Sequence, residues 1–250
     1  MDLGLQGRVA LVGGASAGIG RATAAMLAAE GAKVVVTSRD QERITAAAEE
    51  IGAVAGISWD SDDLEAIDPL IDRVEAEYGP VEILVVNTGG PPGHPDPLSF
   101  TDEQWEAAHR SLVRSPMALL RRVLPGMRER GWGRVINVMS SSVREPIPSL
   151  MLSNAERSAA LAAFKTLARD VAGDGVTLNC LLPGKIDTAR LASNYGSRAE
   201  AEEAGRTTVP ARRLGRPDEM ASAAAFLCSD HAAYITGVAL PVDGGLLHGI

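Results

Sequence analysis

A glycine-rich turn between an apolar run and an Ala-rich segment restricts this chain to few folds. Residues Arg8–Val12 are mostly apolar, positions 13–20 read Gly-Gly-Ala-Ser-Ala-Gly-Ile-Gly, and Gly18–Glu30 has helical spacing. A β-branched run, Lys33–Thr37, follows. Small residues in such a turn let the backbone bend tightly and approach an anion, which the N–H groups at the start of the helix attract. The segment therefore predicts a βαβ unit that can hold a diphosphate.

The same alternation continues along most of the chain. Further helices are predicted near Gln41–Ile51, Asp62–Tyr78, Asp102–Arg130 and Leu152–Ala172, and further strands near Val54–Trp59, Val81–Val86, Arg134–Met139 and Val176–Leu181. Several of these strands are apolar on both faces, which is typical of a parallel sheet covered by helices on both sides. We expect an α/β fold with a doubly wound, Rossmann-type parallel sheet, and residues 1–250 as a single domain.

Composition limits the partners of this chain. Its 250 residues carry a net charge of −8, so no overall positive field attracts nucleic acid or anionic lipid. No run approaches the roughly 18 apolar residues of a membrane span, and the first residues do not resemble a signal sequence. Cys180 and Cys228 lie in apolar or helical contexts and are predicted to be buried free thiols, which fits a reducing compartment. We expect a cytoplasmic protein with a small-molecule substrate, and neither nucleic acid nor membrane as partner.

Two stretches are predicted to be loops. Pro91–Pro97 is rich in proline, and Thr188–Pro210 is polar and rich in Ala and Glu. Both follow predicted strands at the end where open α/β sheets bind ligands, so either is a candidate pocket rim. The second stretch, about residues 188–210, is a candidate substrate loop that contains a covering helix.

The spacing of Gly14, Gly18 and Gly20 resembles that of the short-chain dehydrogenase/reductase family, and the resemblance extends from about Leu5 to Gly245. It is greatest for the 3-oxoacyl reductase-like branch. Further segments that match the family pattern are Asn87-Thr88-Gly89-Gly90, with two substitutions, Pro183-Gly184 with Thr188, Arg213-Leu214-Gly215-Arg216-Pro217, and Gly237 with Val242-Asp243-Gly244-Gly245.

The resemblance implies a nicotinamide dinucleotide site. The residues that it places against the cofactor are Gly14, Ser16, Gly18, Ile19, Gly20, Ser38, Arg39, Asp60, Asn87, Gly89, Arg157, Pro183, Gly184, Ile186 and Thr188. NAD enzymes usually present a carboxylate to the adenosine ribose at the end of the second strand, where this chain has Ser38 and Arg39. A hydroxyl and a guanidinium can bind a 2′-phosphate that a carboxylate would repel, so NADP (NADPH) is favoured over NAD. The alternative for Arg39 is a side chain that simply faces solvent.

The catalytic positions depart from the family pattern. Steps of 13 and 4 from Ser140 lead to the family's tyrosine and lysine positions, where this chain has Ser153 and Arg157. The family's asparagine is replaced by Leu112, so only Ser140 of the four is retained. A serine hydroxyl is a far weaker acid than a phenol, whose pKa is about 10. Arg157 can still donate to ribose hydroxyls, but it does not release a proton to a relay.

No Tyr-x-x-x-Lys pair lies elsewhere in the chain. Among the tyrosines only Tyr195 lies where it can approach a substrate, and it is either a displaced acid or a residue that packs the loop onto the body. His94, in the Pro-rich rim, and His109 have the same two interpretations. Neither histidine has a partner at metal-ligand spacing, so no metal site is predicted.

The helix predicted near Leu152–Ala172 has two distinct faces. Leu161, Phe164, Ala168 and Val171 form a core-facing stripe, and Ala159, Ala160 and Ala163 form a flat face of small residues. Such a face permits close contact between helices. Members of the family commonly associate through this helix and the preceding long one, so the resemblance implies a homodimer or homotetramer.

Three functions remain open from the sequence. The first is an atypical NADP(H)-dependent oxidoreductase that uses Ser140, Ser153 and Arg157 on a small carbonyl compound or alcohol. Its pocket would be largely apolar, lined by Pro146, Pro148, Leu150, Met151, Leu152 and Leu191. The second is a nucleotide-binding protein without turnover, such as a sensor or an oligomer subunit. The third is a lyase or isomerase that reuses the pocket.

Overall fold

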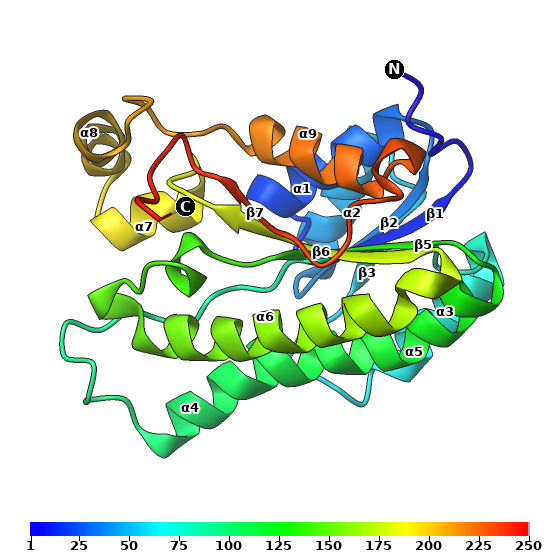
Figure 1. The fold of residues 1–250 in the computed structure, drawn as a ribbon, viewed down its shortest axis with the longest axis horizontal. Coiled ribbons are helices and arrows are strands. Elements are labelled where there is room, and N and C mark those ends of the chain that lie inside the picture. Colours follow the sequence, from blue (N-terminus) through cyan, green and yellow to red (C-terminus); the bar gives the residue numbers. More distant parts are fainter. Residues whose placement is uncertain (250) are drawn as a thin grey trace.

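The computed structural model describes residues 1–249, and its centre is a seven-stranded sheet in which all neighbouring strands run parallel (Figure 1). The strand order is β3-β2-β1-β4-β5-β6-β7. The strands are β1 (Val9–Val12), β2 (Lys33–Ser38), β3 (Ala55–Ser58), β4 (Ile83–Val86), β5 (Gly133–Val138), β6 (Val176–Pro183) and β7 (Ala239–Val242). The order reverses between β1 and β4, and open α/β sheets bind ligands beyond the carboxyl ends of the strands at such a point.

Helices cover both faces of the sheet, as the sequence predicts. One layer contains α1 (Gly18–Ala29), α2 (Gln41–Ile51) and α9 (Pro217–Cys228), and the other contains α3 (Ile67–Tyr78), α4 (Asp102–His109), α5 (Ser115–Glu129) and α6 (Met151–Val171). Strand β1 shows the division directly, because Val9 and Leu11 join the core on the α5–α6 side while Ala10 and Val12 join the core on the α1–α9 side. The doubly wound parallel fold is confirmed.

The long helix that the sequence predicts over Asp102–Arg130 is interrupted. A capping box formed by Thr101 and Gln104 starts α4, and a π-helical turn at Arg110–Arg114 separates it from α5. Turns of this kind widen the helix locally and often occur at functional sites. The helical segment therefore has the predicted extent, with a wider turn at its centre that the spacing does not predict.

One stripe of α6 faces the core along the whole helix. Its buried residues are Leu152, Ser153, Arg157, Ala160, Phe164, Ala168 and Val171. Phe164, Ala168 and Val171 confirm the predicted core face. Leu161 is only half-buried, and Ala160 belongs to the core stripe rather than to the flat face of small residues. The polar pair Ser153 and Arg157 thus continues the core stripe toward the carboxyl ends of the strands.

The segment predicted as a loop with a covering helix contains two helices, α7 (Ala189–Tyr195) and α8 (Arg198–Thr208). Each begins at a side-chain cap: Thr188 Oγ1 accepts from the Leu191 N–H over 3.2 Å, and Ser197 Oγ accepts from the Glu200 N–H over 3.2 Å. The sequence carried this signal in the spacing of each Ser or Thr from the start of its helix.

Both cysteines are buried free thiols, as predicted. Cys180 lies in β6 and Cys228 at the end of α9, and burial raises the pKa of each thiol to about 12. They therefore remain protonated and pack as small apolar side chains. Within residues 1–249, no helix has the length and apolar character needed to cross a bilayer.

Candidate functional site

The glycine-rich turn between β1 and α1 is held by an asparagine from the end of β4. The Asn87 Nδ2 donates to the carbonyl of Gly14 over 3.1 Å and lies 3.4 Å from that of Gly13. Gly14 has a φ of +57°, and a Cβ there would overlap the Asn87 carbonyl oxygen and lie 2.9 Å from Asn87 Nδ2. A Cβ at Gly20 would lie 2.6 Å from the same nitrogen. Both positions therefore require glycine, and the sequence-predicted Gly14, Gly20 and Asn87 meet in one turn.

The start of α1 is open to an anion. The N-cap residue Ala17 provides no side-chain acceptor, and the first turn holds no acidic residue, so these N–H groups have no side-chain counterpart. A Cβ at Gly18 would lie 3.3 Å from the methyl carbon of Thr188, which places Thr188 against this helix start. Ser16 and Ile19, also predicted to contact the cofactor, are half-buried beside it. These residues fit a diphosphate group.

The carboxyl end of β2 presents an unpaired cation. The Arg39 carbonyl accepts from Ser58 Oγ over 2.9 Å, whereas its guanidinium is exposed and has no hydrogen bond or ion pair to the described residues. Ser38 is half-buried just before it. Asp60, which follows β3, is exposed and accepts a local hydrogen bond from the following turn. No carboxylate from β2 itself approaches the edge where a ribose phosphate would lie.

The segment from Pro183 to Thr188 leaves β6 and turns across the same sheet edge. Gly184 passes so close to the C-terminal segment that a Cβ would lie 2.6 Å from the Asp243 Cα. Ile186 then pairs with Gly215 in an isolated parallel bridge. The segment is therefore fixed on both sides before Thr188 caps α7.

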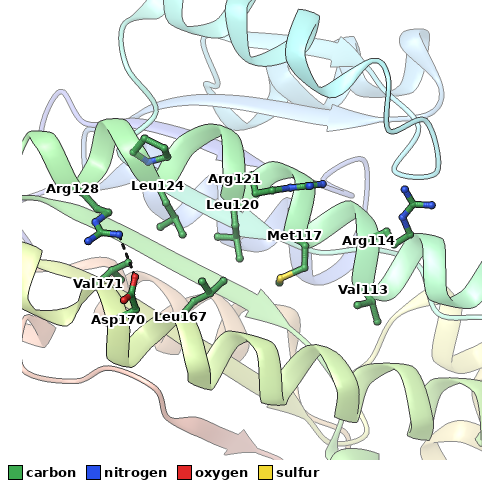
Figure 2. Close-up of a pocket in the computed structure, with 11 residues that line it drawn as sticks. Val113, Arg114, Met117, Leu120, Arg121, Leu124, Arg128, Leu167, Asp170 and Val171 are labelled. Carbon is green, nitrogen blue, oxygen red and sulfur yellow. Dashed lines mark hydrogen bonds and ion pairs between the residues drawn. The ribbon is translucent and has the colours of Figure 1, made fainter.

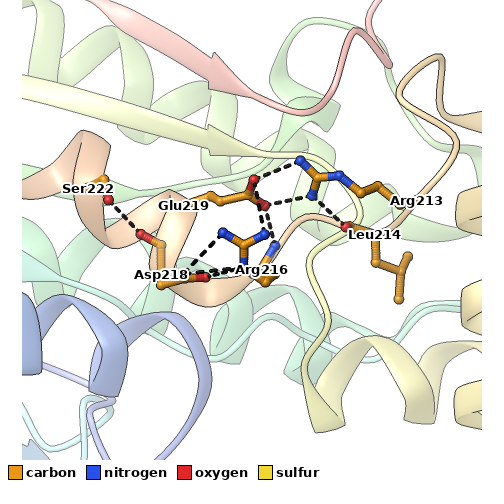
Figure 3. A network of polar contacts seen from close by, with 6 residues as sticks. All are labelled: Arg213, Leu214, Arg216, Asp218, Glu219 and Ser222. Atoms are coloured by element: carbon orange, nitrogen blue, oxygen red, sulfur yellow. Dashed lines mark hydrogen bonds and ion pairs between the residues drawn. The ribbon is translucent and has the colours of Figure 1, made fainter.

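The partner segment of this bridge is anchored by an ion-pair network (Figure 3). Arg213 binds Glu219 through two hydrogen bonds of 2.8 and 2.7 Å, and the Arg216 N–H donates to Glu219 over 2.7 Å. The hydrogen bond from Arg213, followed by that from the Arg216 backbone, lowers the pKa of Glu219 to about 2. The carboxylate thus fixes the turn that supports Ile186.

Ser140 and Ser153 approach the site from different elements. Ser140 follows β5 and caps a short 3-10 turn, and its Oγ accepts from the Ser142 N–H over 3.1 Å. Ser153 lies in the first turn of α6, where its Oγ accepts from Arg157 Nε over 3.2 Å. Because each oxygen is an acceptor in these bonds, each hydroxyl proton remains available to another group.

Arg157 fastens α6 to the end of β5. Its Nη1 donates to the Val138 carbonyl over 3.1 Å, two residues before Ser140, while its Nε binds Ser153. The side chain is 7% exposed. Burial, and to a smaller extent the charge of Arg190, lowers the pKa of Arg157 to about 10, so the guanidinium remains charged at neutral pH. The three predicted catalytic residues thus lie around one junction.

Arg190 is a site residue that sequence reasoning missed. Its Nη2 donates to the carbonyls of Gly90 and Pro91, each over 2.9 Å. A Cβ at Gly90 would lie 3.6 Å from Arg190 Nη2 and 3.7 Å from Arg157 Nη2, so both guanidinium groups lie beside this glycine. No local pattern marks this pairing, because Arg190 lies in a polar segment among other charged residues.

Leu112 occupies the π-helical turn and is 3% exposed. The turn packs against α6, so the helix widens beside the site with an apolar side chain at the centre of the widened turn. Leu152, predicted to line the pocket, is completely buried and cannot do so. Gly89 is exposed at the end of the β4 segment.

Tyr195 and His94 make contacts outside the Ser140–Arg157 junction. The Tyr195 ring lies 5.3 Å from Lys185 Nζ and faces α8, in agreement with the packing interpretation. His94 Nδ1 lies 2.6 Å from Ser99 Oγ, and the Asp96 N–H donates to it over 3.1 Å. These bonds close the Pro-rich loop on itself.

Comparison with known proteins gives consistent matches over almost the whole chain. The family model described as Enoyl-(Acyl carrier protein) reductase matches residues 14–247. The 3-oxoacyl-[acyl-carrier-protein] reductase FabG of Escherichia coli K12 is 37% identical over 247 residues, covering 98% of this chain and 99% of the relative. The crystal structure of L-sorbose reductase from Gluconobacter frateurii, complexed with NADPH and L-sorbose, superposes with a TM-score of 0.93 at 32% identity, covering 100% of both chains. A 3-oxoacyl (acyl-carrier-protein) reductase from Agrobacterium tumefaciens C58 with NADP bound has a TM-score of 0.90 at 34% identity, covering 97% of this chain and 95% of that one.

Proposed function

The chain belongs to the short-chain dehydrogenase/reductase family of oxidoreductases, and from this premise we propose that it is an NADP(H)-dependent oxidoreductase acting on a small carbonyl compound or alcohol. The observation that carries the proposal is the intact turn at β1–α1. Asn87 holds the Gly14 carbonyl, and the start of α1 offers N–H groups without a side-chain counterpart. A cradle with these features suits the diphosphate of a dinucleotide.

Preference for NADP(H) over NAD(H) rests on the carboxyl end of β2. Ser38 and the exposed Arg39 offer a hydroxyl and a guanidinium to a 2′-phosphate. The two solved relatives named above contain NADPH and NADP. The remaining predicted contacts are Asp60 with the adenine, Gly89 with its ribose, and Ile186 with the nicotinamide amide.

The catalytic step uses hydroxyl donors and one buried cation. When bound, the nicotinamide supplies the hydride. Ser140 and Ser153 can each donate a hydrogen bond from the hydroxyl to the substrate oxygen, because both oxygens act as acceptors in their own contacts. Arg157, held beside Ser153 in a poorly solvated place, stabilises negative charge that develops on that oxygen. Because a serine is a weak acid, the proton that completes the alcohol comes from water, and turnover is slower than with the family's tyrosine.

A second candidate is a protein that binds nucleotide without turnover. What favours it is the sequence prediction that Ser153, Arg157 and Leu112 stand at three of the four catalytic positions of the family. In addition, Arg157 Nε donates to Ser153 Oγ, so these two side chains contact each other instead of forming part of a proton relay.

Two measurements separate the candidates. NADPH is titrated by its fluorescence, and a panel of small carbonyl compounds is then assayed with wild type and with the double variant Ser153→Tyr, Arg157→Lys. We expect NADPH binding and slow wild-type turnover that increases in the double variant. NADPH binding with activity only in the double variant would reject the oxidoreductase in favour of the binding protein, and absence of NADPH binding would reject both.

The proposal includes a cytoplasmic homodimer or homotetramer. A groove between α5 and α6 offers an interface, since its floor is apolar and arginines form its rim (Figure 2). The floor includes Val113, Met117, Leu120, Leu124, Leu167 and Val171, and the rim includes Arg114, Arg121 and Arg128. Arg128 is paired with Asp170 of α6 over 3.2 Å. The two other rim arginines, Arg114 and Arg121, would therefore face an approaching second copy of the chain.

A further inference from the structure

Arg157 is a buried cation without a counter-charge. Its side chain is 7% exposed, and its acceptors in the described chain are the neutral Ser153 Oγ, at 3.2 Å, and Val138 carbonyl, at 3.1 Å. Both bonds use Nε and Nη1, which leaves Nη2 without an acceptor from residues 1–249. The one charged group that acts on Arg157 is Arg190, which has the same sign. Such an arrangement is costly, because buried charges are normally paired.

The second guanidinium approaches the same place. Arg190 Nη2 donates to the Gly90 and Pro91 carbonyls, each over 2.9 Å, and Gly90 lies between the two side chains. None of the ion pairs within residues 1–249 includes Arg157 or Arg190. Two like charges therefore converge from α6 and α7 with no acid between them. An anion placed there could accept from Arg157 Nη2 and from the N–H groups of Arg190 other than those of Nη2, which the two carbonyls already occupy.

We propose that Arg157 and Arg190 form an oxyanion-binding site beside Gly90, which holds a carboxylate of the substrate. Guanidinium groups bind carboxylate and phosphate through charge-assisted hydrogen bonds, and both chemistries suit the pair. A glycine at position 90 leaves the space between the two groups free of a side chain.

The position of the pair favours the substrate as the source of the anion. The diphosphate cradle lies at the start of α1, beside Gly18 and Thr188, whereas Arg157 is bonded to the hydroxyl of Ser153. A carboxylate on Arg157 therefore places the adjacent carbon near that hydroxyl. The substrate class that fits is a small 2-oxo acid or 2-hydroxy acid. This assignment rests on the proposed function, because it takes Ser153 as the residue that meets the reacting oxygen.

Oxalate is a suitable probe, because it mimics a 2-oxo acid and is not reduced. Its binding is measured by isothermal titration calorimetry at neutral pH and fixed ionic strength in chloride, with and without saturating NADPH. Wild type is expected to bind one oxalate per chain in both conditions. Arg157→Gln and Arg190→Gln are each expected to weaken binding at least tenfold. Arg43→Gln, an exposed arginine of α2 distant from the site, serves as the matched control and is expected to bind as wild type does.

Each other outcome overturns the proposal. Oxalate that binds only without NADPH, together with weaker NADPH binding in Arg190→Gln, would assign the anion site to the nucleotide phosphates. Saturable binding that survives both substitutions, or no saturable binding in wild type, would remove the site altogether. Because Arg190 is exposed, Arg190→Gln decides the matter even if Arg157→Gln fails to fold. Titration of NADPH alone tests the proposed function separately, since it does not depend on oxalate.

Discussion

Arg157 Nε donates a hydrogen bond of 3.2 Å to Ser153 Oγ, so two of the residues proposed to act in catalysis are partners of each other. Both side chains are buried, one turn apart on the core stripe of α6. The pair therefore has a structural role besides any catalytic one, and we expect a coupling between the two side chains in the stability of the fold.

Stability measurements can test this coupling. Ser153→Ala leaves Arg157 Nε buried without its acceptor, and an unsatisfied buried donor costs about 1–3 kcal/mol. The free energy of unfolding from urea denaturation is expected to fall by that amount. Ser158→Ala, on the exposed side of the same helix, is the control and is expected to change it by less than about 0.5 kcal/mol. Equal effects of the two variants would contradict the role given to Ser153.

A second prediction concerns two adjacent glycines. At Gly13 a Cβ would lie 3.7 Å from its nearest neighbours, and the φ is not positive. Gly13→Ala is therefore expected to stabilise the protein by about 0.4–1 kcal/mol, through loss of conformational freedom in the unfolded chain. Gly14→Ala combines a positive φ with overlap on Asn87, so it is expected to destabilise and to weaken NADPH binding. Thermal melts and NADPH titration check both, and a stable, fully binding Gly14→Ala would show that the turn is not as tight as described.

The sequence predicted the sheet and its two covers because apolar runs and helical spacing are local properties that burial on both faces requires. Gly14 and Asn87 each follow a strand whose carboxyl end meets the same edge of the sheet, and the structure brings them together with Gly20. Contacts between residues far apart in the sequence were harder to predict. Arg190 reaches Gly90 across a long separation in sequence, and nothing near either residue marks the pair.

The π-helical turn was missed although the sequence carries a signal for it. Pro116, in the first turn of α5, has no N–H to donate to the Leu112 carbonyl, and its ring crowds that carbonyl, so a regular α-helix is disfavoured at this point. The widened turn also packs on α6, a contact that the local sequence does not reveal.

Arg39 offers a test of cofactor choice. Arg39→Asp replaces a cation with a carboxylate that would repel a 2′-phosphate and accept hydrogen bonds from ribose hydroxyls. Loss of one charge-assisted hydrogen bond, about 1.5–3 kcal/mol, corresponds to NADPH affinity lower by about 10- to 150-fold. NADH affinity is expected to hold or increase. Arg43→Asp is the control on the neighbouring helix, and an unchanged NADPH/NADH ratio in Arg39→Asp would exclude contact between Arg39 and the phosphate.

The Glu219 network predicts a pH-dependent contribution to stability. Hydrogen bonds from Arg213 and the Arg216 backbone lower the folded pKa of Glu219 from 4.5 to about 2. The unfolded state therefore takes up a proton first, so the stabilisation is complete above about pH 4.5 and is lost as the pH falls toward 2. Because Arg213 is half-exposed, added salt is expected to weaken the effect.

Glu219→Gln keeps an acceptor for the Arg216 N–H and removes the charge. The difference in free energy of unfolding between wild type and this variant, followed by denaturation from pH 7 to pH 2, is expected to favour wild type at neutral pH and to shrink below pH 4.5. A difference that stays constant over this range would show that the carboxylate charge contributes nothing.

The groove between α5 and α6 yields the last prediction, on assembly. Met117 lies half-buried on its floor, close to the rim arginines that the proposal places against a second copy. Met117→Lys puts an ammonium group into an apolar contact beside like charges, and a two-fold interface would contain the change twice. Sedimentation is therefore expected to show dissociation, while NADPH binding by the separate chains persists. Leu98→Lys, at a loop residue that is 89% exposed, is the matched control and should leave assembly unchanged. If Met117→Lys assembles as wild type does, the copies meet through another face, and the apolar groove requires a different explanation.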